Sequence, residues 1–188
     1  WLVVDTGDKC PNVGEAYSVT STGEGQNPGP MTRSVFSLQR VDASDMFGAD
    51  EFVRFGQKVR VCSSEHLFRK TLHLASFTMT GAVKSPASER QPVAMHAVPL
   101  AETAWVIDSL DPNDRFEKQG EVVAANEPIL LRHCHTNVLL ATDAAVPLKN
   151  DFGTEFEVHC KNHSRNNLSQ NLELESQGRL TSDVPSKY

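Results

Sequence analysis

The 188-residue chain has no long apolar run, because charged and polar residues interrupt its hydrophobic residues, which make up 39% of the total. A helix that crosses a bilayer needs about 20 mostly apolar residues in succession, so we expect no membrane span. Basic charge is also sparse, since 18 Lys and Arg stand against 24 Asp and Glu, a net charge of −6. Nucleic-acid-binding proteins concentrate basic charge on one face, so we expect neither a nucleic-acid nor a membrane partner.

Cysteine is scarce and irregularly spaced, at Cys10, Cys62, Cys134 and Cys160. In a chain long enough to bury a core, this spacing favours reduced thiols in a cytosolic protein over a disulfide framework. Two N-glycosylation patterns, at Asn162 and Asn167, matter only if the protein is secreted. The chain begins at Trp1 instead of Met, and we expect an N-terminal part to precede it.

The centre of the chain predicts a β-hairpin. Two short apolar runs, 129–131 and 138–140, flank the polar segment 132–137. Two such runs around a short polar segment are typical of a hairpin, and Asn137 tolerates the left-handed backbone that closes a turn. An imperfect copy of this hairpin occupies residues 56–76, which indicates an internal repeat.

Alternating apolar residues extend the repeat to four predicted strands in each unit. The strands of the second unit lie near 57–62, 71–76, 92–98 and 104–110, and those of the third unit lie near 127–132, 138–142, 154–160 and 171–175. Three four-stranded units around a pseudo-threefold axis form a β-trefoil, which removes exposed strand edges. We therefore predict an all-β fold, a single β-trefoil domain over 1–177 with repeats at about 1–41, 56–110 and 126–175, followed by a tail at 178–188. The first unit is short by one strand, which we expect upstream of Trp1.

The segments between strands are predicted loops and turns. We expect turns at 147–153 and in the charged connection 111–119, where Gly120 assists. Four longer loops are candidate binding segments, because loops on a rigid scaffold often bind partners: 23–30, 42–55 (which includes a possible helical turn), 76–91 and 161–170.

Candidate chemistry is weak throughout. The two His/Cys clusters are His133-Cys134-His135 and His159-Cys160-Lys161-Asn162-His163. Neither has the paired spacing of a structural zinc site, and neighbours on a strand point to opposite sides, so Cys134 lacks an adjacent base. The triplet at 151–153 matches the metal-binding triplet of kinases but stands alone, and we interpret it as a turn. We therefore expect no catalytic, cofactor-binding or metal-ligating residues, no cofactor and no enzymatic activity.

A sugar-binding trefoil is an open alternative. Such lectins commonly repeat Gln-x-Trp in the last strand of each unit, and here the equivalent triplets are Thr103-Ala104-Trp105 and Gln170-Asn171-Leu172. The tryptophan is present once and absent once, so we expect Trp105 to be a core residue.

The order of several short motifs resembles the family of cilia- and flagella-associated protein 161. The resemblance covers about 56–160 and, more weakly, 17–41. Its central motif is His133-x-His135-Thr136-Asn137, followed by Leu140-Ala141. The other matching residues are, upstream, Trp105, Pro112, Arg115, Gly120, Val123 and Ala125-Asn126-Glu127 and, downstream, Phe152-Gly153, Glu155 and Glu157-Val158. One departure is Leu172, where the family tends to have tryptophan.

The resemblance implies a MIR-like β-trefoil and a structural role inside axonemal doublet microtubules. On that basis the expected partners are α/β-tubulin and neighbouring microtubule inner proteins, and the expected location is the doublet lumen of a cilium or flagellum. The family pattern includes no catalytic residues, and it leaves the binding residues unknown. The alternative function is a MIR-like or lectin-like module that binds a glycan or a protein.

Overall fold

The computed structural model describes residues 1–10, 16–22, 31–41, 51–68, 70–111 and 113–161. Within these ranges lie the short helix α1 (Glu65–Phe68), the 3-10 turns η1 (Thr32–Ser34) and η2 (Ala101–Thr103), and the strands β1 (Leu2–Lys9), β2 (Ala16–Ser21), β3 (Phe36–Arg40), β4 (Lys58–Ser63), β5 (His73–Ser76), β6 (Gln91–His96), β7 (Trp105–Ser109), β8 (Ile129–His133), β9 (Leu140–Asn150) and β10 (Gly153–Cys160). The predicted all-β class is therefore confirmed. No helix in the described ranges is long and apolar enough to cross a membrane.

The repeat is visible in the register of two strand pairs. β3 pairs antiparallel with β4, with Phe36 opposite Ser63, and β7 pairs antiparallel with β8, with Trp105 opposite His133. Both pairs continue for five residues in the same register. Phe36 and Trp105 thus occupy equivalent positions in their units.

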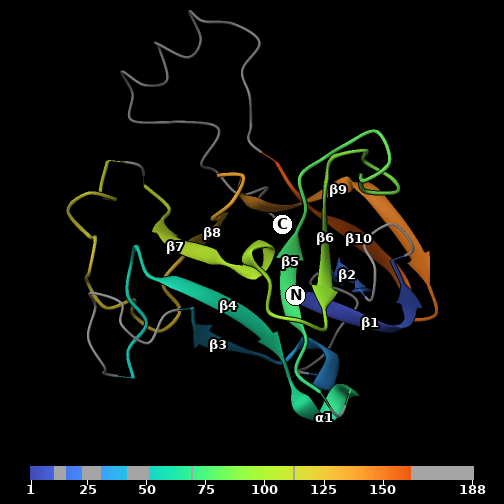
Figure 1. The fold of residues 1–188 in the computed structure, drawn as a ribbon, viewed down its shortest axis with the longest axis horizontal. Coiled ribbons are helices and arrows are strands. Elements are labelled where there is room, and N and C mark those ends of the chain that lie inside the picture. The colour runs from blue at the N-terminus through green and yellow to red at the C-terminus, as the bar shows by residue number, and fades with distance from the viewer. Residues whose placement is uncertain (11–15, 23–30, 42–50, 69, 112, 162–188) are drawn as a thin grey trace, which may run out of the picture.

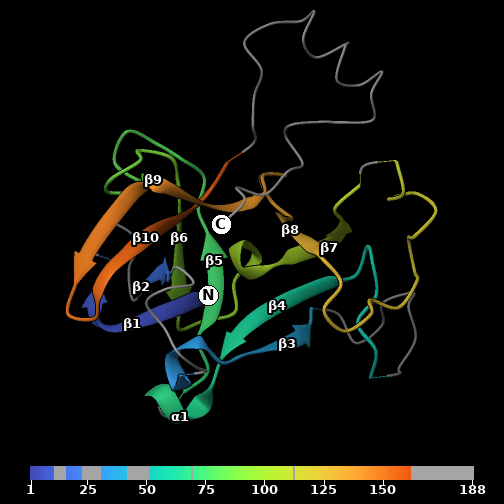
Figure 2. The ribbon, with the colours of Figure 1, turned by 180° about the vertical axis from the view of Figure 1, so that it is seen from behind.

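The hairpins of the three units meet around a common axis (Figures 1 and 2). They are β1–β2, β5–β6 and β9–β10, one from each unit. The second strand of each hairpin pairs antiparallel with the second strands of both others, so that β2, β6 and β10 form a closed triangle. This closure is the geometry of a β-trefoil and confirms the pseudo-threefold prediction.

The core lies between the paired strands β3–β4 and β7–β8 and the triangle formed by β2, β6 and β10. Its members come from all three units, and they include Val4, Val19, Val59, Leu74, Met95, Trp105, Ile107 and Val158, each at most 4% exposed. Trp105 is completely buried, and its indole Nε1–H donates to the carbonyl of Leu74 at 2.8 Å. The prediction that Trp105 is a core residue is therefore confirmed.

The predicted turn at 147–153 is wrong in its extent. β9 continues through Pro147 to Asn150, and the turn is confined to Asp151 and Phe152, after which β10 begins at Gly153. Pro147 pairs opposite Phe156, next to a shift in register between Phe156 and Val158. A bulge of this kind is where a strand can accept a proline, which has no N–H for the ladder.

The smaller turn predictions agree with the structure. Asn137 has φ +59° and Gly120 has φ +89°, the left-handed conformation expected at each position. Several other predictions lie wholly or largely outside the described residues: the loops 23–30 and 161–170, the helical turn within 42–55, the strand 171–175, the boundary at 177 and the tail 178–188. Asn162, His163 and Asn167 also lie there.

Candidate functional site

The turn of the central hairpin, which contains the His-x-His-Thr-Asn motif, is held by hydrogen bonds around the buried His133. His133 ends β8 and is completely buried, with Nε2 at 2.9 Å from the carbonyl of Glu102 and Nδ1 at 2.8 Å from the hydroxyl of Thr136. A carbonyl only accepts, so Nε2 bears the proton and Nδ1 accepts from Thr136. Burial lowers the pKa of His133, which keeps the ring neutral in this role.

The same turn is tied to a second unit of the fold. The side-chain amide of Gln91 on β6 donates to Oγ of Ser76 and to Oγ1 of Thr136, each at 2.8 Å. At the end of the turn, the amide oxygen of Asn137 accepts from Arg132 at 2.7 Å. The polar groups of the motif therefore bind the protein itself. His135 is different, because it is exposed.

Two of the described thiols, those of Cys62 and Cys134, are poorly suited to act as nucleophiles. Burial raises the pKa of Cys134, and it raises the pKa of Cys62 to about 11. Cys62 Sγ lies 3.3 Å from Nδ1 of His73, a contact that the sequence analysis missed because eleven residues separate the two. Since the thiolate is the nucleophilic form, such a raised pKa disfavours nucleophilic attack by Cys62 at neutral pH.

In the ranges that the structure describes, no three His, Cys, Asp or Glu side chains are grouped as metal ligands would be. His133 and His159 are both buried within hydrogen-bonded clusters of the fold. His163 lies outside the described ranges.

A buried carboxylate fixes part of the candidate loop 76–91. Glu157 on β10 is 3% exposed, and its two oxygens accept from the backbone N–H groups of Ala87 and Ser88, each at 2.9 Å. Arg90 donates to Nε2 of the buried His159 at 2.7 Å, which leaves the proton of the neutral ring on Nδ1. Burial, followed by the charge of Arg90, lowers the pKa of His159 to about 4. The end of this loop is thus held rigidly on the third unit.

A second buried carboxylate joins the third unit to the first. Glu155 is 1% exposed and forms an ion pair with Arg33, while its other oxygen accepts from Thr20 at 2.5 Å and Asn150 at 2.7 Å. Burial alone would raise the pKa of Glu155, but these hydrogen bonds outweigh it and hold the pKa below its usual value. The guanidinium of Arg33 also stacks 3.9 Å above the ring of Phe152.

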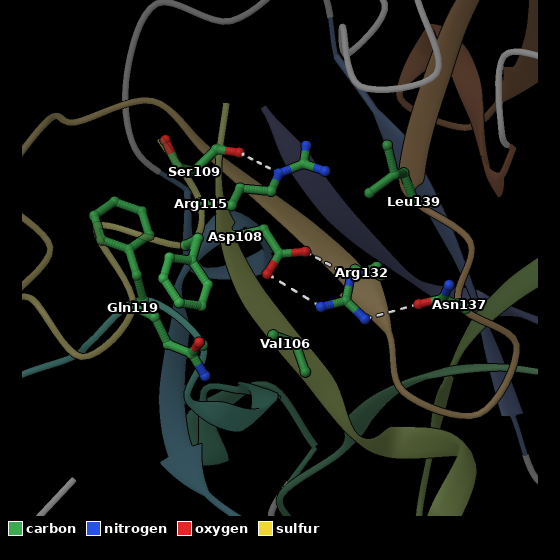
Figure 3. A pocket seen from close by; sticks show the side chains of 11 residues that line it. Val106, Asp108, Ser109, Arg115, Gln119, Arg132, Asn137 and Leu139 are labelled. Carbon is green, nitrogen blue, oxygen red and sulfur yellow. Dashed lines mark hydrogen bonds and ion pairs between the residues drawn. The ribbon is translucent and has the colours of Figure 1, made fainter. Parts of the chain in front are cut away.

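A cleft of about 610 Å³ lies beside the central turn, on the outer side of β7 and β8. Asp108 and Arg132 line it and form an ion pair, with Nε to Oδ2 at 2.5 Å and Nη2 to Oδ1 at 3.2 Å (Figure 3). Arg115 and Gln119 reach the cleft from the loop that follows β7. Phe55, Phe116 and Leu139 also line the cleft. It is a candidate ligand site that the sequence did not indicate, because its residues come from four separate segments.

An exposed apolar ribbon is the other surface that the sequence analysis missed. Phe116, 88% exposed, lies in the segment predicted as a merely charged connection and also lines the cleft, whereas Phe52 and Val122 are 59% and 41% exposed on the paired segments 52–56 and 120–124. In the sequence, the signal for this surface is an isolated phenylalanine among charged residues in each segment. The pairing of segments 52–56 and 120–124 is visible only in the structure.

The fold and these buried networks define a MIR-like β-trefoil protein. It is similar to solved structures that share this fold, among them the SDF2-like protein from Arabidopsis thaliana, with a TM-score of 0.64 and 17% identity over 87% of this chain and 80% of that one. A part of the protein O-mannosyltransferase Pmt1-Pmt2 complex from S. cerevisiae is also similar, with a TM-score of 0.61 and 20% identity over 88% of this chain and 21% of that one.

Sequence comparison identifies the family. The model of the cilia- and flagella-associated protein 161-like domain matches residues 18–172, and the chain belongs to this family. Its relatives include cilia- and flagella-associated protein 161 of Mus musculus, 32% identical over 133 residues, and that of Danio rerio, 30% identical over 129 residues. These alignments cover 71% and 69% of this chain but only 44% and 42% of the relatives, so the chain spans about two fifths of their length. The resemblance seen in the sequence is therefore confirmed, and the protein is a cilia- and flagella-associated protein.

Proposed function

We propose that this protein is a non-enzymatic structural component of the axoneme, which binds the luminal face of doublet microtubules and stabilises them. Family membership supports the ciliary setting. The observation that supports a structural role is the fate of the motif's polar groups: His133, Thr136 and Asn137 are all bonded within the fold. These three side chains maintain the shape of the turn, while His135 of the same motif is exposed.

The proposed partners are α/β-tubulin and neighbouring inner proteins. The chain's net charge of −6 does not suit binding to an acidic polymer surface by charge, so affinity would come from shape-matched contacts. A trefoil with several loops can touch more than one subunit of a lattice. Tethering at several points then multiplies weak contacts without requiring any one of them to be strong.

The test is localisation of the tagged full-length protein, followed by high-salt extraction of isolated axonemes. We expect the tagged protein to be detected along the axoneme and to remain there after extraction. The control is a protein of the outer microtubule surface, which the same extraction should remove. Loss of the protein in the first wash would contradict a luminal position. Localisation to the endomembrane system would contradict the axonemal role altogether.

The polar cleft favours a second candidate, a MIR-like module that binds a glycan or peptide. The Asp108–Arg132 pair presents both a carboxylate and a guanidinium at the cleft, which suits a ligand rich in hydroxyl or amide groups. Saturable binding on a glycan array, weakened by Asp108→Asn, would support this function. A flat array response would leave the structural role as the better explanation.

A further inference from the structure

Residues 52–56 and 120–124 form a two-stranded ribbon at one end of the molecule, at the left of Figure 1 and the right of Figure 2. Arg54 bridges antiparallel to Val122, Phe55 N–H donates to Glu121 O at 3.0 Å, and Val123 N–H donates to Val53 O at 2.9 Å. This register places 52 opposite 124 and 54 opposite 122. We call this segment, with the adjoining turn 114–118, the phenylalanine ribbon.

The two faces of the phenylalanine ribbon differ in burial. Side chains alternate along a strand, so Val53, Phe55 and Val123 share one face, and all three pack against the core. Phe52 and Val122 share the other face as diagonal neighbours, a separation over which large side chains meet. Phe116 lies at the middle of the adjoining turn, which the bond from Lys118 N–H to Asp114 O closes at 2.8 Å. The outer face is thus exposed, and it carries the apolar Phe52 and Val122 with Arg54 opposite Val122.

The ribbon is held rigidly although its outer face is exposed. Arg54 Nη1 donates to Gly120 O at 2.8 Å, and Arg115 Nε donates to Ser109 O at 3.0 Å. Lys118 Nζ binds Glu127 at 3.0 Å and lies 5.5 Å from the centre of the Phe55 ring. Because the backbone is already ordered, binding a partner through this face costs little conformational entropy.

Charge identifies the kind of partner. The segments 51–57 and 109–128 contain six acidic and three basic residues, and the three basic ones are those bonded within the ribbon. Glu51, Glu117 and Glu121 are exposed around the apolar residues. A second copy of this chain would bring two acidic ribbons together, and an anionic membrane surface would also repel them. A basic protein surface is the complementary partner.

We propose that the phenylalanine ribbon, through the exposed Phe116 of its turn and the exposed Phe52 and Val122 of its strands, inserts into an apolar pocket rimmed by Lys or Arg on a protein of the doublet wall. This inference rests on the proposed axonemal function and names the surface that performs it. Exposed aromatic anchors that fill such pockets account for much of the energy of known interfaces. The carboxylates around the ribbon would fix the orientation of docking.

The first test is photocrosslinking in isolated axonemes. The full-length tagged protein would bear p-benzoylphenylalanine in place of Phe116, or, as a matched control, in place of Val98, which is 51% exposed on another turn. We expect position 116 to crosslink to one identified peptide of another axonemal protein that contains apolar and basic residues. Crosslinks within this chain or to a second copy, or a yield no greater than at position 98, would overturn the proposal.

The second test measures affinity for doublet microtubules prepared from axonemes that lack the protein. Replacing an aromatic anchor at an interface commonly costs tenfold or more in affinity, so we expect Phe116→Ser to bind at least about tenfold more weakly and Val98→Ser to bind like the wild type. Equal binding of both variants and the wild type would refute docking through the phenylalanine ribbon but would not contradict the proposed function. Failure of the wild type to bind would instead refute the proposed function.

Discussion

The buried pair of Glu155 and Arg33 should dominate the stability of this fold. Glu155 is on β10 of the third unit, whereas Arg33 and Thr20 belong to the first, so the pair joins two units directly. The most informative perturbation is Glu155→Gln, which keeps the shape of the side chain and removes its charge. In either orientation of the new side-chain amide, its NH₂ group faces a hydrogen-bond donor, which is Arg33 in one orientation and Asn150 in the other. The NH₂ group cannot accept from either of them. The variant therefore leaves Arg33 buried without a counter-charge.

The size of the effect follows from burial, since Arg33 is 8% exposed and Glu155 is 1% exposed. Breaking a buried ion pair by removing one partner costs about 3–5 kcal/mol. In a protein of this size each kcal/mol lowers the melting temperature by about 2–4 °C, so we expect a drop of roughly 6–20 °C. The stacking of Arg33 on Phe152 adds to the cost if the guanidinium moves away.

The assay is urea denaturation of the purified chain, with a control variant and an apolar double variant for comparison. The exposed Glu117→Gln is the matched control and should change the free energy of unfolding by less than about 0.5 kcal/mol. The double variant Arg33→Met with Glu155→Leu should recover most of the loss, because an apolar pair leaves no buried charge. A loss below about 1 kcal/mol in Glu155→Gln, or a double variant no more stable than the single one, would refute this reasoning.

The remaining predictions concern single side chains. Asn137→Val should destabilise the protein by about 1–3 kcal/mol in the same assay because valine is strained at φ +59°, whereas Asn137→Gly should be tolerated. Trp105→Phe leaves the carbonyl of Leu74 unpaired and should cost about 1–3 kcal/mol in thermal unfolding, even if the smaller ring packs well. Unfolded histidine binds a proton near pH 6.5 whereas folded His159 does so at about 4, so stability should fall as pH drops through this window. The His159→Gln variant, which keeps an acceptor for Arg90, should show a flatter pH dependence in urea titrations.

Local pattern was sufficient for most of the secondary structure. Period-two alternation located the described strands of the second and third units, apart from the second half of β9, and the left-handed tolerance of Asn137 located the turn that closes the central hairpin. The extent of the turn at 147–153 could not be predicted, because Pro147 is accepted into β9 only through a bulge in its pairing with β10. Whether a bulge exists depends on the partner strand and not on the proline.

The repeat also determined the architecture, since equivalent strands in successive units must occupy equivalent places around one axis. What the sequence could not determine is which polar side chains the closed fold brings together. Glu155 and Arg33 are 122 residues apart, and the outer face of the phenylalanine ribbon joins segments separated by more than 60 residues. Alternation assigns each side chain to a face of its own strand, but only the closure of three units about the axis decides which faces meet, which become buried and which remain exposed.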